Sequence, residues 1–96
     1  MNIVTLIGNL TDDAVLTEGE DERTTATFDL TVTTKVAGND ETSVLTCETN
    51  LASALHVIPE LKKGARVAID GWLRYRTSTG KTSVVARRIE LLGGAR

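Results

Sequence analysis

The chain has 96 residues, of which 41% are hydrophobic and 25% are charged, and its formal net charge is −2 at pH 7. This length suits one domain with a modest core; no apolar run approaches the about 18–20 residues of a membrane span, and residues 1–4 lack the features of a secretory signal. A single cysteine and a single histidine exclude an internal disulfide and the usual all-protein zinc sites, so we expect a cytoplasmic protein.

Most of the chain alternates apolar and polar residues with the two-residue period of strands that bury one face. Three segments with this pattern are predicted strands: 26–33, 42–49 and 67–76. Segments 3–7 and 84–92 are also predicted strands, because they are rich in apolar and β-branched residues. Three polar segments that each contain a glycine predict hairpin turns: 18–22, 37–40 and 77–81. Cys47 falls on the apolar face of the third strand, where we expect a small buried residue. Gly71 interrupts the fourth strand at a point where a bend would fit.

One stretch between the third and fourth predicted strands has a helical period instead. Apolar residues within 51–61 are spaced by three and four, Asn50 is placed to cap the start, and Lys62-Lys63-Gly64 is a typical helix end. Pro59 cannot donate a backbone hydrogen bond and clashes with the preceding turn. We therefore expect a short helix that ends near Val57 or is kinked there.

The order of these elements predicts an all-β fold. Five strands with one short helix between the third and fourth form the layout of an OB-fold, a small and partly open Greek-key barrel. Residues 1–96 are expected to form a single domain of this kind.

Several segments also resemble the bacterial single-stranded-DNA-binding proteins (SSB). These segments are 2–13, 26–30, 61–71, 73–76 and 88–93. They occur in the same order as in the family and with nearly the same spacing. The resemblance implies sequence-independent binding of single-stranded DNA during replication, recombination or repair. It also implies a homo-oligomer of such barrels, a tetramer as the first expectation and a dimer as the second, with replication proteins among its partners and no contact with a membrane.

Two features of that family are missing from these residues. The family stacks DNA bases on aromatic side chains, and the corresponding positions fall at or near Val36, Val44, Asn50 and Ser78. Stacking contributes about 1–3 kcal/mol per base, so the loss of several aromatic side chains predicts weaker binding. Members of the family also carry a flexible tail with an acidic tip that recruits partners, and 93–96 is not such a tip.

The charges are distributed unevenly along the chain. Residues 1–61 contain eleven acidic and two basic residues, whereas residues 62–88 contain eight basic residues and one acidic residue. A basic segment indicates a local surface that can meet phosphate groups, although a small domain also needs charges simply to stay solvated.

The fourth strand contains the main candidates for nucleic-acid contact. Trp72, Arg74 and Arg76 share one parity, opposite Leu73 and Tyr75. If Leu73 lies in the core, the other three form an exposed row of one indole and two guanidinium groups, which suits phosphates and bases. The resemblance places both arginines on the DNA-facing strand of the family and Trp72 outside its usual stacking positions. Burial of Trp72 between subunits is the alternative, and Tyr75 is expected to point inward with Leu73.

Three further basic residues are candidate contacts. Lys35 and Lys81 lie in or beside turns that flank the binding cleft of this fold. Arg88 shares a face with apolar residues of the last strand while Arg87 lies opposite, so only one of the two is expected to line a given groove.

Nothing in the sequence indicates catalysis, and we expect neither an enzyme nor a cofactor or metal. His56 lies among apolar residues, and Thr79-Gly80-Lys81-Thr82 lacks the upstream glycine of a phosphate-binding loop. Two alternatives to an SSB-like protein stay open. The missing aromatics and tail favour a primosome-type OB module that binds DNA weakly and docks onto replication proteins. The acidic net charge favours a structural or protein-interaction OB subunit that does not bind nucleic acid.

Overall fold

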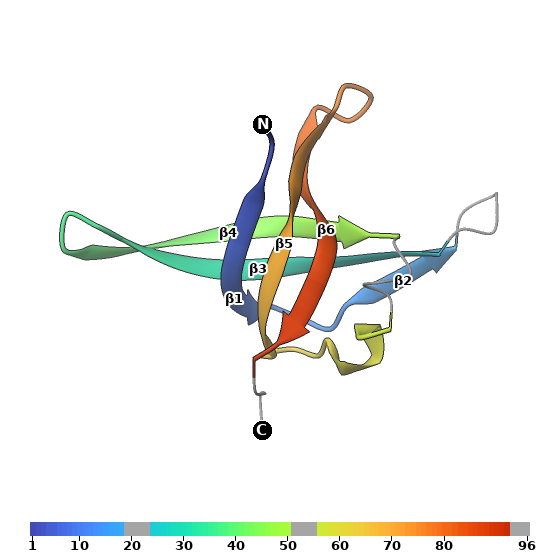
Figure 1. Cartoon of the computed structure of the whole chain (residues 1–96), viewed down its shortest axis with the longest axis horizontal. Helices are drawn as coiled ribbons and strands as arrows, with labels where there is room; N and C mark the ends of the chain where they lie inside the picture. The colour runs from blue at the N-terminus through green and yellow to red at the C-terminus, as the bar shows by residue number, and fades with distance from the viewer. Residues whose placement is uncertain (19–23, 51–55, 93–96) are drawn as a thin grey trace.

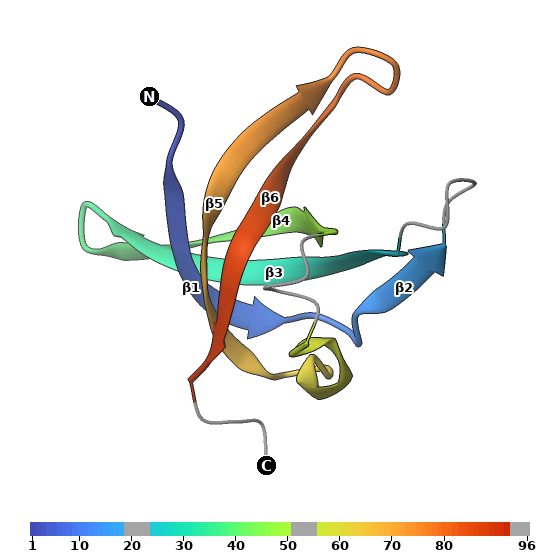
Figure 2. The same cartoon turned by 45° about the vertical axis from the view of Figure 1, so that its right-hand side comes forward.

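The structure is a computed structural model, and it describes residues 1–18, 24–50 and 56–92. Its elements in chain order are β1 (Val4–Leu10), β2 (Val15–Glu18), β3 (Thr24–Val36), β4 (Asn39–Thr49), the 3-10 turn η1 (Ile58–Glu60), β5 (Arg66–Arg76) and β6 (Lys81–Leu91). In Figures 1 and 2 the long β3–β4 hairpin crosses behind β1, β5 and β6, and the β5–β6 hairpin extends away from the crossing.

Five of the strands close into a barrel. The strand order is β1-β5-β6-β4-β3, and β3 returns to β1 through the pairs Asn9–Thr31 and Leu10–Leu30. The β4–β6 pairing is parallel and the others are antiparallel. This is the Greek-key barrel of an OB-fold, so the prediction of an all-β, five-stranded barrel is confirmed. The sequence pattern did not predict β2, which lies outside the barrel and, among the described strands, pairs with β3 alone.

The β3–β4 hairpin is held in register by its turn. β3 ends at Val36 and β4 begins at Asn39, so Ala37 and Gly38 form a two-residue connection. Their φ angles are 51° and 84°, and positive φ at both positions is the requirement of a type I′ turn, whose twist matches that of the strands. The turn predicted at 37–40 is confirmed.

The barrel interior is filled from alternate residues of the strands, as the two-residue period predicted. Its most deeply buried members come from four strands and the base of the barrel: Ala26, Leu30, Cys47, Leu61, Val67, Ile69, Val84 and Ala86. Burial raises the pKa of the Cys47 thiol to about 12, and the nearby charge of Asp29 adds to this effect. The thiol therefore stays protonated at neutral pH, and Cys47 is the buried apolar residue that its position predicted.

The short helix predicted between the third and fourth predicted strands is not supported. Residues 51–55 lie outside the described residues, and the described part of this segment contains only the 3-10 turn η1. Pro59 lies in the first positions of this turn, where its missing N–H does not break a longer hydrogen-bond ladder. Ile58 and Leu61 are both buried and close the base of the barrel.

The β5–β6 hairpin bends away from the barrel at Gly71. Asp70 pairs with Arg88 but Gly71 pairs with Ala86, so Arg87 is an extra residue that forms a β-bulge in β6. A Cβ atom on Gly71 would lie only 1.8 Å from the carbonyl oxygen of Val85, so no other residue fits there without moving the backbone.

Beyond this bulge the residues on the inner face of β5 are exposed. Leu73 and Tyr75 continue the parity of the buried residues Val67 and Ile69, yet they are 47% and 62% exposed. Leu73 therefore does not lie in the core, and the prediction that Tyr75 points inward with it is wrong. The period of two correctly gives the face of the strand, but the pairing of β5 with β1 ends at Gly71. Beyond it the β5–β6 hairpin extends away from the barrel (Figure 2).

Replacing Gly71 by Ala is expected to lower the free energy of unfolding by about 3 kcal/mol, because the new methyl group meets backbone rather than a movable side chain. Gly80→Ala is the matched control. Its φ of +68° costs about 1 kcal/mol in strain, but its Cβ would meet nothing closer than 3.9 Å. Urea unfolding of both variants measures the difference, and a Gly71→Ala protein as stable as the Gly80→Ala protein would contradict the close approach.

Candidate nucleic-acid interface

In OB-folds, ligands bind on the outer face of the second and third barrel strands, between the loop after the first strand and the loop between the fourth and fifth. In this chain those barrel strands are β3 and β4. The outer face pairs Thr27 with Glu48 and Asp29 with Thr46. The Thr46 hydroxyl donates a 3.0 Å hydrogen bond to the Asp29 carboxylate. The floor of the face is therefore polar, and it contains carboxylates as well as hydroxyl groups.

Aromatic side chains are absent from this floor. The chain has three aromatic residues, of which Phe28 is buried in the barrel and the other two, Trp72 and Tyr75, lie on β5. Val44 is exposed on the outer face of β4 at a position where the SSB resemblance implies stacking. A base placed there would meet an aliphatic side chain, which provides no π-face.

Two hollows meet at Thr46 on this face, and they differ in charge. The first, here called the acidic hollow, is lined by three carboxylates, those of Asp12, Asp13 and Asp29. Asp13 also accepts a 2.8 Å hydrogen bond from the backbone N–H of Lys63, which ties the bend after β1 to the base of the barrel. This end of the face disfavours a phosphate backbone.

The second hollow, here called the basic hollow, lies at the β5–β6 hairpin. Two cations, Arg76 and Lys81, line it together with one carboxylate and a group of hydroxyl side chains: Glu48, Thr46, Thr79, Thr82 and Ser83. Lys81 forms no ion pair with another described residue. Cations and hydroxyl donors together are a suitable environment for a phosphate group.

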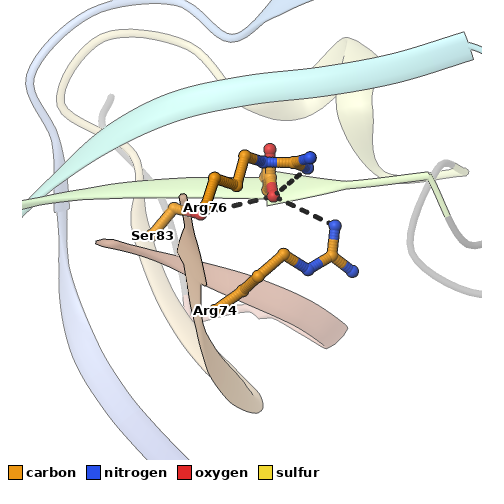
Figure 3. Close-up of polar contacts among 4 residues, drawn as sticks. Arg74, Arg76 and Ser83 are labelled. Carbon is orange, nitrogen blue, oxygen red and sulfur yellow. Dashed lines mark hydrogen bonds and ion pairs between the residues drawn. The ribbon is translucent and has the colours of Figure 1, made fainter. Parts of the chain in front are cut away.

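The outer row, defined as Trp72, Arg74 and Arg76, lies on one face of β5 as the parity predicted. Trp72 is partly buried opposite Val85, and Arg74 lies opposite Ser83. Both guanidinium groups point to the Glu48 carboxylate, at 3.5 Å for Arg74 and 2.9 Å for Arg76 (Figure 3). The three side chains of the outer row therefore do share one face of β5, but the positive charge of the two arginines is partly neutralised by Glu48, which the sequence pattern did not predict.

Of the two candidate lysines, only Lys81 lies near the outer row. Lys81 begins β6 opposite Arg76 and joins the basic hollow. Lys35 lies near the tip of the β3–β4 hairpin, lines neither hollow and forms an exposed ion pair with Asp40 at 3.5 Å. Such an exposed pair contributes little to stability.

Arg88 lies apart from the outer row. It lines a separate hollow near the middle of β5 and β6, and Arg87 lines the same hollow with Asp70 as its ion-pair partner. The prediction that only one of these arginines lines a given groove is wrong. The bulge at Arg87 interrupts the alternation of β6, so both side chains reach the outer surface.

The closed barrel with a polar outer face on β3 and β4 defines an OB-fold domain of the ligand-binding type. A model of the single-strand binding protein family matches residues 1–93, and the chain belongs to that family. The resemblance found in the sequence is thereby confirmed. The comparison with individual curated proteins gives no match.

Within the described ranges 1–18, 24–50 and 56–92, no helix has the length and apolar character required to cross a membrane. Nor do His, Cys, Asp and Glu side chains gather there in a group of three or more that would hold a metal ion.

Proposed function

We propose that this protein binds single-stranded DNA without sequence preference, in the cytoplasm, in support of replication, recombination or repair. The observation that carries the proposal is the position of Arg74, Arg76 and Lys81 on one surface beside the OB face of a chain from the single-strand binding protein family. Guanidinium and ammonium groups bind phosphates without reading the base sequence.

Electrostatic contacts supply most of the binding in this proposal. The floor of the OB face has no aromatic side chain to stack on bases, so phosphate contacts replace stacking. For single strands the slope of log K against log salt is about −0.7 per phosphate contacted. With about three to five contacts, affinity is expected to fall about ten- to fiftyfold between about 50 and 150 mM salt.

Changing Arg74 and Arg76 together to Ala is expected to weaken binding of oligo(dT) and to flatten the salt slope by about 1.4, because two phosphate contacts are lost. Fluorescence titration at several salt concentrations measures both quantities. The matched control is Lys62→Ala with Lys63→Ala, which removes the same charge at the base of the barrel. Equal losses in the two double variants would show that the outer row is not the binding surface.

Trp72 is proposed as the stacking residue of the outer row. A base stacked on its indole quenches the emission, and Trp72→Ala then weakens binding by about 1–3 kcal/mol without affecting assembly. Tyr75→Ala, on the opposite face of the same strand, is the control. If the indole instead lies between subunits, oligo(dT) leaves the emission unchanged and the Trp72→Ala protein dissociates.

The proposed assembly is a homotetramer, with a dimer as the second possibility. β1 pairs with β5 along 4–9 but meets β3 only at Asn9 and Leu10, so the first part of β1 leaves an open edge. Ile3 and Ile7 beside this edge are exposed. An unpaired edge with apolar side chains is a surface that pairing with another copy would cover.

Light scattering at micromolar concentration is expected to give an oligomer mass, and Ile7→Glu is expected to lower that mass, because a charge would be buried at the interface. Val36→Glu changes an apolar residue that is equally exposed at the far end of β3, and it should leave the mass unchanged. A monomer mass for the unmodified chain would contradict the proposed assembly.

One observation favours the alternative of a module that binds DNA weakly and docks onto other replication proteins. The acidic hollow covers part of the face on which OB-folds bind their ligands, and its carboxylates suit a basic protein segment better than a phosphate backbone. The titration with oligo(dT) separates the two functions, since binding absent even at low salt would leave protein docking as the better proposal.

A further inference from the structure

Glu48 occupies the centre of the proposed binding surface. Its side chain is only 15% exposed, and one carboxylate oxygen, Oε1, accepts hydrogen bonds from Arg76 Nη2 at 2.9 Å and from Ser83 Oγ at 3.3 Å. The same oxygen forms an ion pair with Arg74 Nη1 at 3.5 Å. Glu48 belongs to β4, whereas its three partners belong to the β5–β6 hairpin (Figure 3). The carboxylate therefore connects the floor of the OB face to the hairpin.

This contact uses the same donors that a phosphate would use. Carboxylate and phosphate oxygens are both preferred acceptors of the guanidinium group. The side chains of Arg74 and Arg76 remain 41% and 46% exposed, so a phosphate can approach them from the solvent side. With Glu48 in place, the two arginines and their partner together carry one positive charge rather than two.

The space around Arg76 is large enough for its guanidinium group to exchange the Glu48 carboxylate for a phosphate. Arg76 lies between a hollow of about 40 Å³ on the Arg74 side and the basic hollow of about 230 Å³ on the Lys81 side. The larger space is next to Lys81, which attracts the same phosphate. When Arg76 turns toward it, the Glu48 carboxylate keeps the Ser83 hydroxyl as a donor and is not left without a hydrogen bond.

We propose that Glu48 is an internal competitor of the nucleic-acid phosphate, and that it sets the affinity and the salt dependence of this surface. The inference rests on the proposed function. A bound phosphate replaces the Glu48 carboxylate on Arg76 and shares the basic hollow with Lys81, so part of the binding energy is spent on breaking the internal ion pair.

The test is a titration of oligo(dT) against the full chain and Glu48→Gln at several salt concentrations. Gln keeps the shape and can still accept from Ser83, but it removes the charge. Affinity at low salt is expected to rise about tenfold, because a negative charge next to the phosphate is gone. The salt slope is expected to steepen by up to about 0.7, because one negative charge no longer offsets the charge of the two arginines at the phosphate.

Two controls separate this effect from a general change of charge or stability. Glu60→Gln removes a carboxylate at the base of the barrel and should alter affinity far less. Adding Glu48→Gln to the Arg74→Ala, Arg76→Ala protein should give no gain, since the gain acts through those arginines. If urea unfolding shows Glu48→Gln to be poorly folded, Glu48→Thr, a β-branched residue suited to the strand, is used and must raise affinity in the same way.

The outcomes also distinguish this inference from the function on which it rests. If the unmodified chain binds oligo(dT) and Glu48→Gln binds equally tightly with the same slope, the competitor role is overturned and the proposed function stands. If neither protein binds at low salt, both are overturned. A gain that persists without the two arginines also overturns the competitor role, because the effect would then come from charge alone.

Discussion

The architecture depends on a short parallel seam between β4 and β6. Only two residue pairs form it, Cys47 with Val84 and Glu48 with Val85, and this seam closes the barrel. The first pair points into the core, where both side chains are buried. In the second pair Glu48 points outward, directly beneath the hairpin that carries the arginines. The register that closes the core therefore also determines which carboxylate meets the outer row.

Much of the fold could be predicted because local alternation reports which face of a strand is buried. The apolar faces of β3, β4 and the first half of β5 follow it directly. The pattern cannot report where a barrel ends, so Leu73 and Tyr75 have the parity of core residues although both are exposed. Nor does it detect β2, whose four residues are too few to show a period.

The candidate site could likewise be predicted only where it depends on the alternation of residues along one strand. The shared face of Arg74 and Arg76 is a local property of one strand, and it was found. Their contact with Glu48 joins residues 26 and 28 positions apart through the parallel seam, and the sequence carries no local signal for it. The outward exposure of Arg87 and Arg88 likewise depends on a bulge that only the pairing partner β5 reveals.

The distribution of charge across the OB face has a consequence for how a single strand lies on it. A nucleic-acid backbone is uniformly negative, so it gains most where cations are concentrated and loses most near carboxylates. The acidic hollow is not simply a repulsive surface, because Asp13 and Asp29 also accept structural hydrogen bonds there. Its charges therefore cannot be removed without cost to the fold. The path that we propose for a single strand therefore runs along the β5–β6 hairpin, over Arg74, Arg76 and Lys81, rather than across the full width of β3 and β4.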